Sequence, residues 1–169
     1  KHGVTIAQIL LSPDDTEQRR RHLNARATIS TLLSLNVVPI INENDTVTTK
    51  ELRFGDNDRL GARVAQMVSA DTLILLSDVD GLYNRDPRQD KTAYHIPVVE
   101  KITSEIEAMA GITTTNYSSG GMITKLAAAR IANTAGCHMI IANGTILNPI
   151  RAIENGAQST WFQASSTPH

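Results

Sequence analysis

Three short apolar runs, each followed at once by polar residues, limit the folds open to this 169-residue chain. The runs are VVPII (37–41), TLILL (72–76) and HMIIA (138–142), and the polar segments NEND, SDVDG and ANGT begin where the runs end. A continuous apolar run of this length is typical of a strand covered on both faces, as in parallel sheets.

Helical patterns lie between these strands. Asp58 is placed to cap a helix whose apolar residues recur at helical spacing, and Ser104-x-x-Glu107 predicts a capping box. In chain order we expect a strand at 4–11, a helix at 17–35, a strand at 37–41, a helix at 58–68, a strand at 72–76, a helix within 103–110, a helix from 121 to about 135, a strand at 138–142, a short helix from 149 and a last strand at 159–162.

This alternation predicts an α/β fold, a three-layer αβα sandwich with a mostly parallel central sheet. We expect one domain over residues 1–163, with 164–169 as a disordered tail or the start of a linker. Ligands of such sheets bind beyond the carboxyl ends of the strands, so the three polar segments are expected at one edge.

Composition excludes several classes of function. Sixteen basic residues against seventeen acidic ones give a formal charge of -1, which offers no general attraction to nucleic acid or membranes. Cys137 is the only cysteine, so the chain has no internal disulfide and no cysteine-based metal cage. No apolar run approaches the roughly 20 residues that span a bilayer, and a cytoplasmic protein is expected. The chain starts without Met and looks like a piece of a longer protein.

The first polar cluster combines NEND (42–45) with GDND (55–58). Isolated Asn and Asp residues after a strand usually form turns, but a turn does not need six of them together with Glu43. Carboxamides and carboxylates together suit a small zwitterion, whose carboxylate and ammonium they would bind.

The second cluster is LLSDVDGLYNRDP. Its Asp-x-Asp-Gly does not fit a calcium loop of the EF-hand type, which needs Gly at the sixth position and Glu at the twelfth. A turn explains Gly81 and Asp86-Pro87, whereas the polar pair Ser77-Asp78 at the strand end is compatible with a nucleotide site.

The third cluster is SSGGMITK (118–125). Two glycines at a helix start let backbone amides approach an anion, and Lys125 lies one turn into the helix. A glycine-rich loop followed by a surface lysine remains an alternative. No Walker A loop, GxGxxG or GxSxG is present. Taken together, the three clusters favour phosphoryl transfer to a small amino acid.

The segments VVPIINENDTV, FGDNDRL, LLSDVDGLY and GGMITK, in this order, resemble the glutamate 5-kinases of the amino acid kinase family over residues 4–163. The resemblance implies transfer of the γ-phosphoryl group of ATP to the side-chain carboxylate of L-glutamate, in proline biosynthesis. It implies Mg²⁺ as cofactor, proline as a feedback inhibitor and a homo-oligomer, dimer or tetramer.

The resemblance also implies roles for individual residues, according to their positions in the matching motifs. Asp45 and Asn57 match glutamate-binding positions, and Asp58 matches an acid that orients catalytic lysines. Lys125 matches the cation that stabilises the transferring group. The remaining expected contacts are Asn42, Asn44 and Asp56 for glutamate, and Ser77, Asp78, Ser119, Gly120, Gly121, Met122, Ile123 and Thr124, together with Lys125, for the nucleotide.

Two departures from the family pattern affect these expectations. Ser118-Ser119 stands where Gly or Arg and then Thr are usual, and the initial strand with its Lys-x-Gly-[ST] loop is absent, as is a carboxy-terminal PUA domain. This sequence alone is therefore expected to show weak or no catalysis. The alternatives are a non-catalytic fragment that binds an amino acid or nucleotide, and another kinase of the family acting on acetylglutamate or uridylate.

Overall fold

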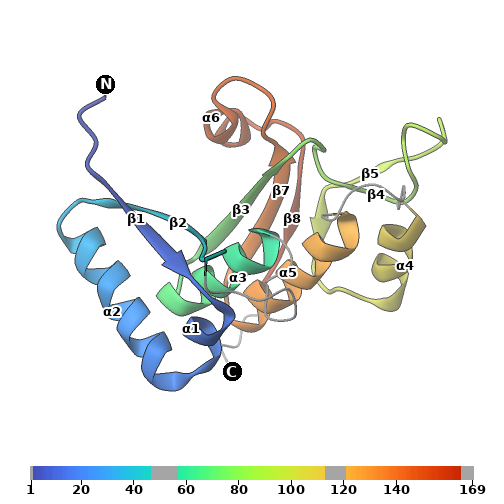
Figure 1. The fold of residues 1–169 in the computed structure, drawn as a ribbon. Helices are drawn as coiled ribbons and strands as arrows, with labels where there is room; N and C mark the ends of the chain where they lie inside the picture. Colours follow the sequence, from blue (N-terminus) through green and yellow to red (C-terminus); the bar gives the residue numbers. More distant parts are fainter. Residues whose placement is uncertain (1, 47–56, 113–120, 165–169) are drawn as a thin grey trace.

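The computed structural model describes residues 2–46, 57–112 and 121–164. Its elements alternate in the expected order (Figure 1). They are β1 (Ile6–Leu11), α1 (Pro13–Glu17), α2 (Arg19–Ser34), β2 (Val38–Glu43), α3 (Asn57–Val68), β3 (Thr72–Ser77), β4 (Leu82–Tyr83), β5 (His95–Ile96), β6 (Val98–Val99), α4 (Ser104–Ile112), α5 (Met122–Thr134), β7 (His138–Asn143), α6 (Pro149–Glu154) and β8 (Ser159–Phe162).

Parallel pairing dominates the larger strands. A four-stranded sheet has the order β3-β7-β8-β6, in which β3 pairs parallel with β7, and β6 parallel with β8. In this sheet only β8 runs antiparallel to its neighbour β7, since β8 starts at the edge where β7 ends and Ala142 pairs with Ser159. A separate parallel pair, β1-β2, and a small antiparallel hairpin, β4-β5, complete the strands of the described residues. The predicted α/β class is confirmed.

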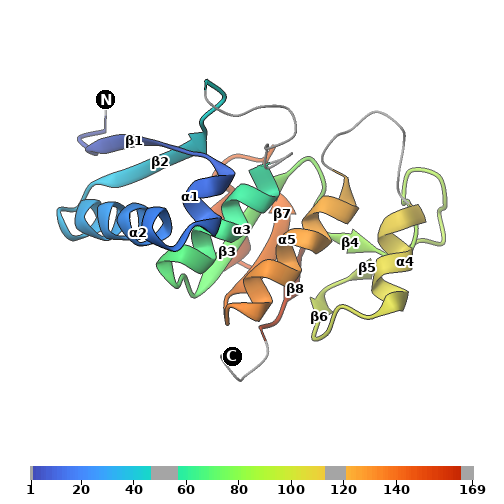
Figure 2. The same cartoon turned by 60° about the horizontal axis from the view of Figure 1, so that its bottom comes forward.

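Two helices pack on one face of the four-stranded sheet. Figure 2 shows α3 and α5 side by side in front of β3 and β7, and they also contact one another. In Figure 1, the short helix α6 lies at the end of β7 where its arrow ends, and it contacts β7.

The main hydrophobic core lies between α5 and the sheet. Fully buried alanines of α5 allow the helix to approach the strands closely, and Met139, Ile141 and Phe162 fill the facing surface. Cys137 belongs to this core with 1% of its surface exposed, and burial raises the pKa of its thiol.

The β1-β2 pair has its own small core, formed by Leu11 and Leu60 with Ile9, Ile41 and two further side chains, Ala25 and Val64. Its outer face is open, because Val38 and Ile40 are 44% and 49% exposed. The prediction that VVPII is covered on both faces is therefore wrong. The run is apolar on both faces, but among the described residues only the inner face packs against helices.

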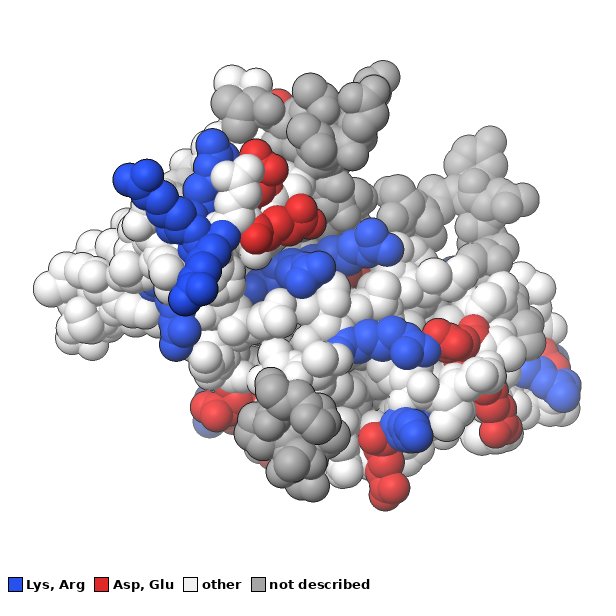
Figure 3. All heavy atoms as spheres, turned by 90° about the horizontal axis from the view of Figure 1, so that it is seen from below, with Lys and Arg blue, Asp and Glu red and all other residues white. Residues whose placement is uncertain are grey.

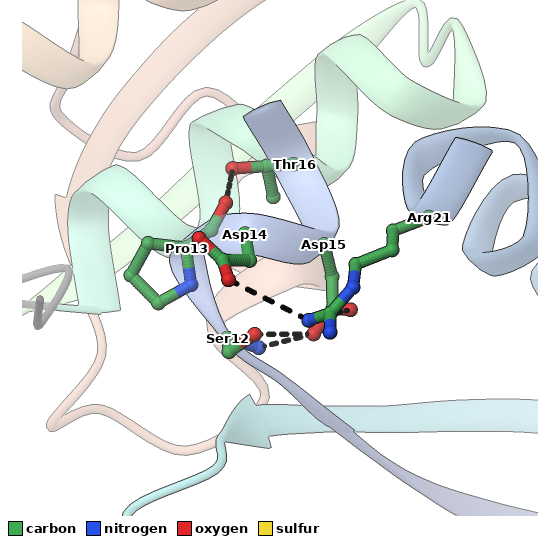
Figure 4. A network of polar contacts seen from close by, with 6 residues as sticks. All are labelled: Ser12, Pro13, Asp14, Asp15, Thr16 and Arg21. Atoms are coloured by element: carbon green, nitrogen blue, oxygen red, sulfur yellow. Dashed lines mark hydrogen bonds and ion pairs between the residues drawn. The ribbon is translucent and has the colours of Figure 1, made fainter. Parts of the chain in front are cut away.

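The helix predicted over 17–35 is α2, and a short separate helix that was not predicted, α1, precedes it. Ser12 and Asp15 form a capping box that starts α1, with the Ser12 amide and hydroxyl both donating to Asp15 Oδ2 at 2.6 and 2.7 Å (Figure 4). Gln18 then takes an extended conformation (φ -80°, ψ 117°) before α2 begins. Arg21 reaches back to Asp14 and Asp15 at 3.6 and 3.8 Å, across the break.

The cap of α4 also differs from the prediction by one residue. The Thr103 hydroxyl accepts the Ile106 amide at 3.4 Å, so Thr103 rather than Ser104 caps the helix. Glu107 forms no capping box because its carboxylate pairs with Arg130 of α5. That ion pair joins α4 to α5 instead.

The arginines at the start of α2 face solvent. Arg19, Arg20 and Arg21 are exposed, as expected of a solvated charge run. Figure 3 shows basic side chains gathered over the α2 and α3 side of the molecule, with carboxylates beside them. No helix within the described residues has the length and apolar character needed to cross a membrane.

Candidate functional site

The loops after β3 and β7 lie side by side at one sheet edge. Ser77 pairs with Asn143 in register, and the Gly144 amide donates to the Ser77 carbonyl at 2.7 Å. A Cβ on Gly144 would lie within 3.0 Å of the Leu76 side chain, so this close approach requires glycine. The expectation that SDVDG and ANGT share an edge is confirmed.

Two helix N-termini point to the same edge. Helix α3 leads through a short turn into β3, and α5 leads in the same way into β7. Each helix packs against the strand that follows it and so runs antiparallel to that strand. The N-terminus of each helix therefore lies near the carboxyl end of its strand, where helix dipoles favour an anion.

A buried ion pair joins these two N-termini. Lys125 Nζ donates to Asp58 Oδ2 at 3.0 Å, and Lys125 is only 7% exposed. The Thr124 hydroxyl lies 3.2 Å from the same carboxylate oxygen and 2.8 Å from the Gly121 carbonyl. The predicted cap role of Asp58 is wrong, since α3 already begins at Asn57 and the carboxylate turns toward α5 instead.

Gly121 is the N-cap residue of α5, in extended conformation, as predicted for the helix start. Met122, Ile123 and Thr124 form the first turn, and Ile123 is half exposed. A lysine in the second turn of such a helix, held by a carboxylate, gives a fixed positive charge beside the N-terminal amides. Ser119 and Gly120 lie outside the described residues.

The NEND segment ends β2 and approaches α3. Asn42 and Asn57 line the same cavity, of about 380 Å³, whose other lining is mostly apolar. The Asn44 amide donates to the Leu11 carbonyl at 2.8 Å, which fixes the segment against β1. Asp45 is exposed beyond it, and Asp56 falls outside the described residues. The structure thus brings Asn42 near Asn57, and Asp58 near Lys125.

Ser77 and Asp78 lie at the end of β3, with the Ser77 hydroxyl 3.1 Å from Asp78 Oδ1. Asp78 is exposed and Ser77 is half-buried. Both residues are accessible at the edge where the nucleotide is expected, and the loop that carries them continues to Gly81.

Sequence reasoning missed a polar network behind this loop, formed by Asp80, Tyr83, His95, Gln158 and Thr160. Burial raises the pKa of Tyr83, and the adjacent Asp80 charge adds to the shift. Burial lowers the pKa of His95. The sequence held one signal, a threonine at an inward position of the strand STWF, where an apolar residue is expected.

A model of the amino acid kinase family matches residues 1–143. The chain belongs to the amino acid kinase family.

Among members of the amino acid kinase family, it is 63% identical over 165 residues to the glutamate 5-kinase of Gluconobacter oxydans (strain 621H) and 60% identical over 167 residues to that of Paramagnetospirillum magneticum (strain ATCC 700264 / AMB-1). These matches cover 98% and 99% of this chain but 44% and 45% of the relatives, so the chain spans a little under half their length.

The fold agrees with solved kinases. UMP kinase from Bacillus anthracis superposes with a TM-score of 0.63 at 15% identity, over 98% of this chain and 61% of that one. At this identity the likeness concerns the fold alone.

Proposed function

We propose that the chain forms part of an ATP-dependent kinase that phosphorylates the side-chain carboxylate of L-glutamate to L-glutamyl 5-phosphate, the first step of proline biosynthesis. The observation that carries the proposal is the buried Lys125–Asp58 pair at the junction of two helix N-termini. The similarity to glutamate 5-kinases, at 57–63% identity, supports the choice of reaction.

Each group has a part in the transfer. Lys125 stabilises the negative charge that builds up on the transferring phosphoryl group, and Asp58 holds the ammonium in place. The amides at the start of α5, with Gly121 as cap, bind phosphate oxygens, together with Ser119 and Gly120. Ser77 and Asp78 bind the rest of the nucleotide.

Glutamate occupies the opposite side of the Lys125–Asp58 pair in this proposal. Asn42 and Asn57 face a shared cavity, and amide donors suit a carboxylate substrate. Asp45 binds the ammonium group of the substrate, and Asn44 and Asp56 complete the pocket.

Mg²⁺ is assigned to the phosphates of ATP. Within the described residues no group of three or more His, Cys, Asp or Glu side chains is arranged to hold a metal. In this proposal the ion arrives with the nucleotide and neutralises charge on the phosphates.

Other kinases of the family are weaker candidates. The relatives that match nearly all of this chain at 57–63% identity are glutamate 5-kinases, whereas the UMP kinase match has 15% identity. We extend the proposal to a cytoplasmic homo-oligomer, dimer or tetramer, that proline inhibits.

Hydroxamate formation tests the proposal. Full-length protein, ATP, Mg²⁺, L-glutamate and hydroxylamine should give glutamyl hydroxamate, whereas N-acetylglutamate or UMP in place of glutamate should give no phosphorylated product. Product from one of these alternatives alone would overturn the substrate assignment. Binding of ATP and glutamate without turnover by the full-length protein would favour a non-catalytic binding role.

A further inference from the structure

We propose that Thr160 and Gln158 are positioning residues that hold the nucleotide-binding loop 77–81 in place. Thr160 lies in the strand β8 and Gln158 directly precedes it, and we call these two residues the clamp. The inference rests on the proposed function, because it assigns this loop to ATP. Neither residue belongs to the expected site, and both follow the loop by about 80 positions in the chain.

Thr160 is the buried half of the clamp. It is 0% exposed; its hydroxyl accepts the Leu82 amide at 2.7 Å and donates to the Ile96 carbonyl at 2.6 Å. Since the only hydroxyl proton goes to Ile96, the contact with His95 Nε2 at 3.2 Å places a proton on that nitrogen. Thr160 thus holds β4, β5 and β8 together at one atom.

Gly81 shows how closely the loop is held. Its φ of +151° lies in the region that favours glycine, and a Cβ there would fall within 3.0 Å of both Thr160 Oγ1 and His95 Nε2. The backbone of the loop therefore passes directly over the Thr160 hydroxyl.

Gln158 is the exposed half of the clamp. Its Nε2 donates to Asp80 Oδ2 at 2.8 Å and to the Tyr83 hydroxyl at 2.7 Å, and that hydroxyl donates to Asp80 Oδ1 at 3.1 Å. Both amide protons are used, so the three side chains form a closed triangle. The Tyr83 ring meets the His95 ring edge-on at 5.3 Å, which connects the two halves.

The loop is consequently fixed at both ends. Ser77 is tied to Gly144 on one side, and Asp80 and Leu82 are tied to β8 on the other. Asp78 lies between these anchors, where its carboxylate is free of the clamp and accessible. A clamp of this kind lowers the cost of ordering the loop when the nucleotide binds.

The test compares two variants of the full-length enzyme with matched controls. Gln158→Glu keeps the shape of the side chain but sets a carboxylate against Asp80, and Gln163→Glu makes the same charge change at an exposed position just beyond β8. Thr160→Val removes the hydroxyl at nearly constant volume, and Thr160→Ser restores it. The readouts are the KM for ATP, the KM for glutamate, Tm and direct ATP binding by calorimetry.

We expect Gln158→Glu to raise the KM and the Kd for ATP about tenfold, the size of one lost hydrogen bond to a charged group. The KM for glutamate and Tm should stay near those of Gln163→Glu. Thr160→Val should weaken the binding of ATP to a similar degree, and Thr160→Ser should restore that binding. Unchanged affinity for ATP in Gln158→Glu, or an equal loss of affinity for ATP and for glutamate, would overturn the positioning role. The proposed function would still stand. Failure of the unsubstituted enzyme to bind ATP would overturn the proposed function and this role with it.

Discussion

At the scale of single residues, the Lys125–Asp58 pair combines a structural and a chemical role. Both charges are largely buried. Asp58 Oδ2 lies 3.0 Å from Lys125 Nζ, and its negative charge balances the positive charge of the lysine. Removing one partner of such a pair leaves the other charge uncompensated, which typically costs about 3–5 kcal/mol.

We predict that Lys125→Met in the full-length enzyme lowers kcat by about 10²–10³-fold, because the transition state loses its cation. Lys101→Met, a change at an exposed position, is the control and should leave kcat unchanged. Steady-state kinetics at saturating ATP and glutamate measure the effect. Wild-type kcat in Lys125→Met would show that this lysine does not act on the transferring group.

A second residue, Asp90, gives a pH-dependent prediction. The Thr92 hydroxyl and then Arg85, whose Nη1 donates at 2.9 Å, hold the pKa of Asp90 at about 2, below its ordinary 3.8. The carboxylate therefore stabilises the fold above pH 3.8, and this contribution is lost as pH falls toward 2. Asp90→Asn should lower the urea midpoint at pH 6 by a margin that shrinks below pH 3.8. A margin that is constant with pH would show that ionisation of Asp90 is not the cause.

At the scale of elements, the sequence predicted those whose start or apolar face is marked by residues within the element itself. The apolar positions of α3 and the glycines around α5 gave both helices correctly. It missed the short helix α1, which starts at the capping box of Ser12 and ends before Gln18, and it missed Thr103, which caps α4 in place of Ser104. Both errors come from competing side-chain hydrogen bonds of similar energy one or a few residues apart.

The strand β2 shows a different limit. Val38, Ile40 and Ile41 are all apolar. Of these three, only Ile41 packs into a core, where it contacts the cluster of Leu11 and Leu60. Apolar character alone does not tell which face is covered, because that depends on elements distant in the chain.

We predict that Ile41→Thr lowers the free energy of unfolding by about 1–3 kcal/mol, since it loses packing and buries a hydroxyl. Ile40→Thr, the same change on the neighbouring and half-exposed residue, should cost within about 0.5 kcal/mol. Urea denaturation of this chain carrying either substitution measures both. Equal losses would show that the outer face of β2 is covered.

At the scale of the whole molecule, the candidate site joins segments that no local pattern connects. Asp58 and Lys125 are 67 positions apart, and Gln158 and Asp80 are 78 apart. Family resemblance supplied the first pair, because its motifs carry both residues. It supplied nothing for the second, since Gln158 lies outside those motifs and only the antiparallel pairing of β8 with β7 brings it to the loop.

The β1-β2 pair is attached to the rest of the molecule mainly through helices. Within the described residues it shares no strand pairing with the four-stranded sheet, and its small core meets α3 at Leu60. The main core around α5 and β7 is much larger. Regions with few buried apolar contacts open at lower free energy than the main core.

Native-state hydrogen exchange should therefore show faster exchange in β1-β2 than in β3-β7. Leu60→Ala should accelerate the amides of β1-β2 further, while the amides of β7 keep their protection, because the cavity weakens only the smaller core. Leu126→Ala, which removes the same atoms from the main core, is the matched control and should reduce protection in β7. Exchange followed by mass spectrometry on peptides of each strand separates the two. If Leu60→Ala accelerated β1-β2 and β7 equally, the molecule would open as one cooperative unit.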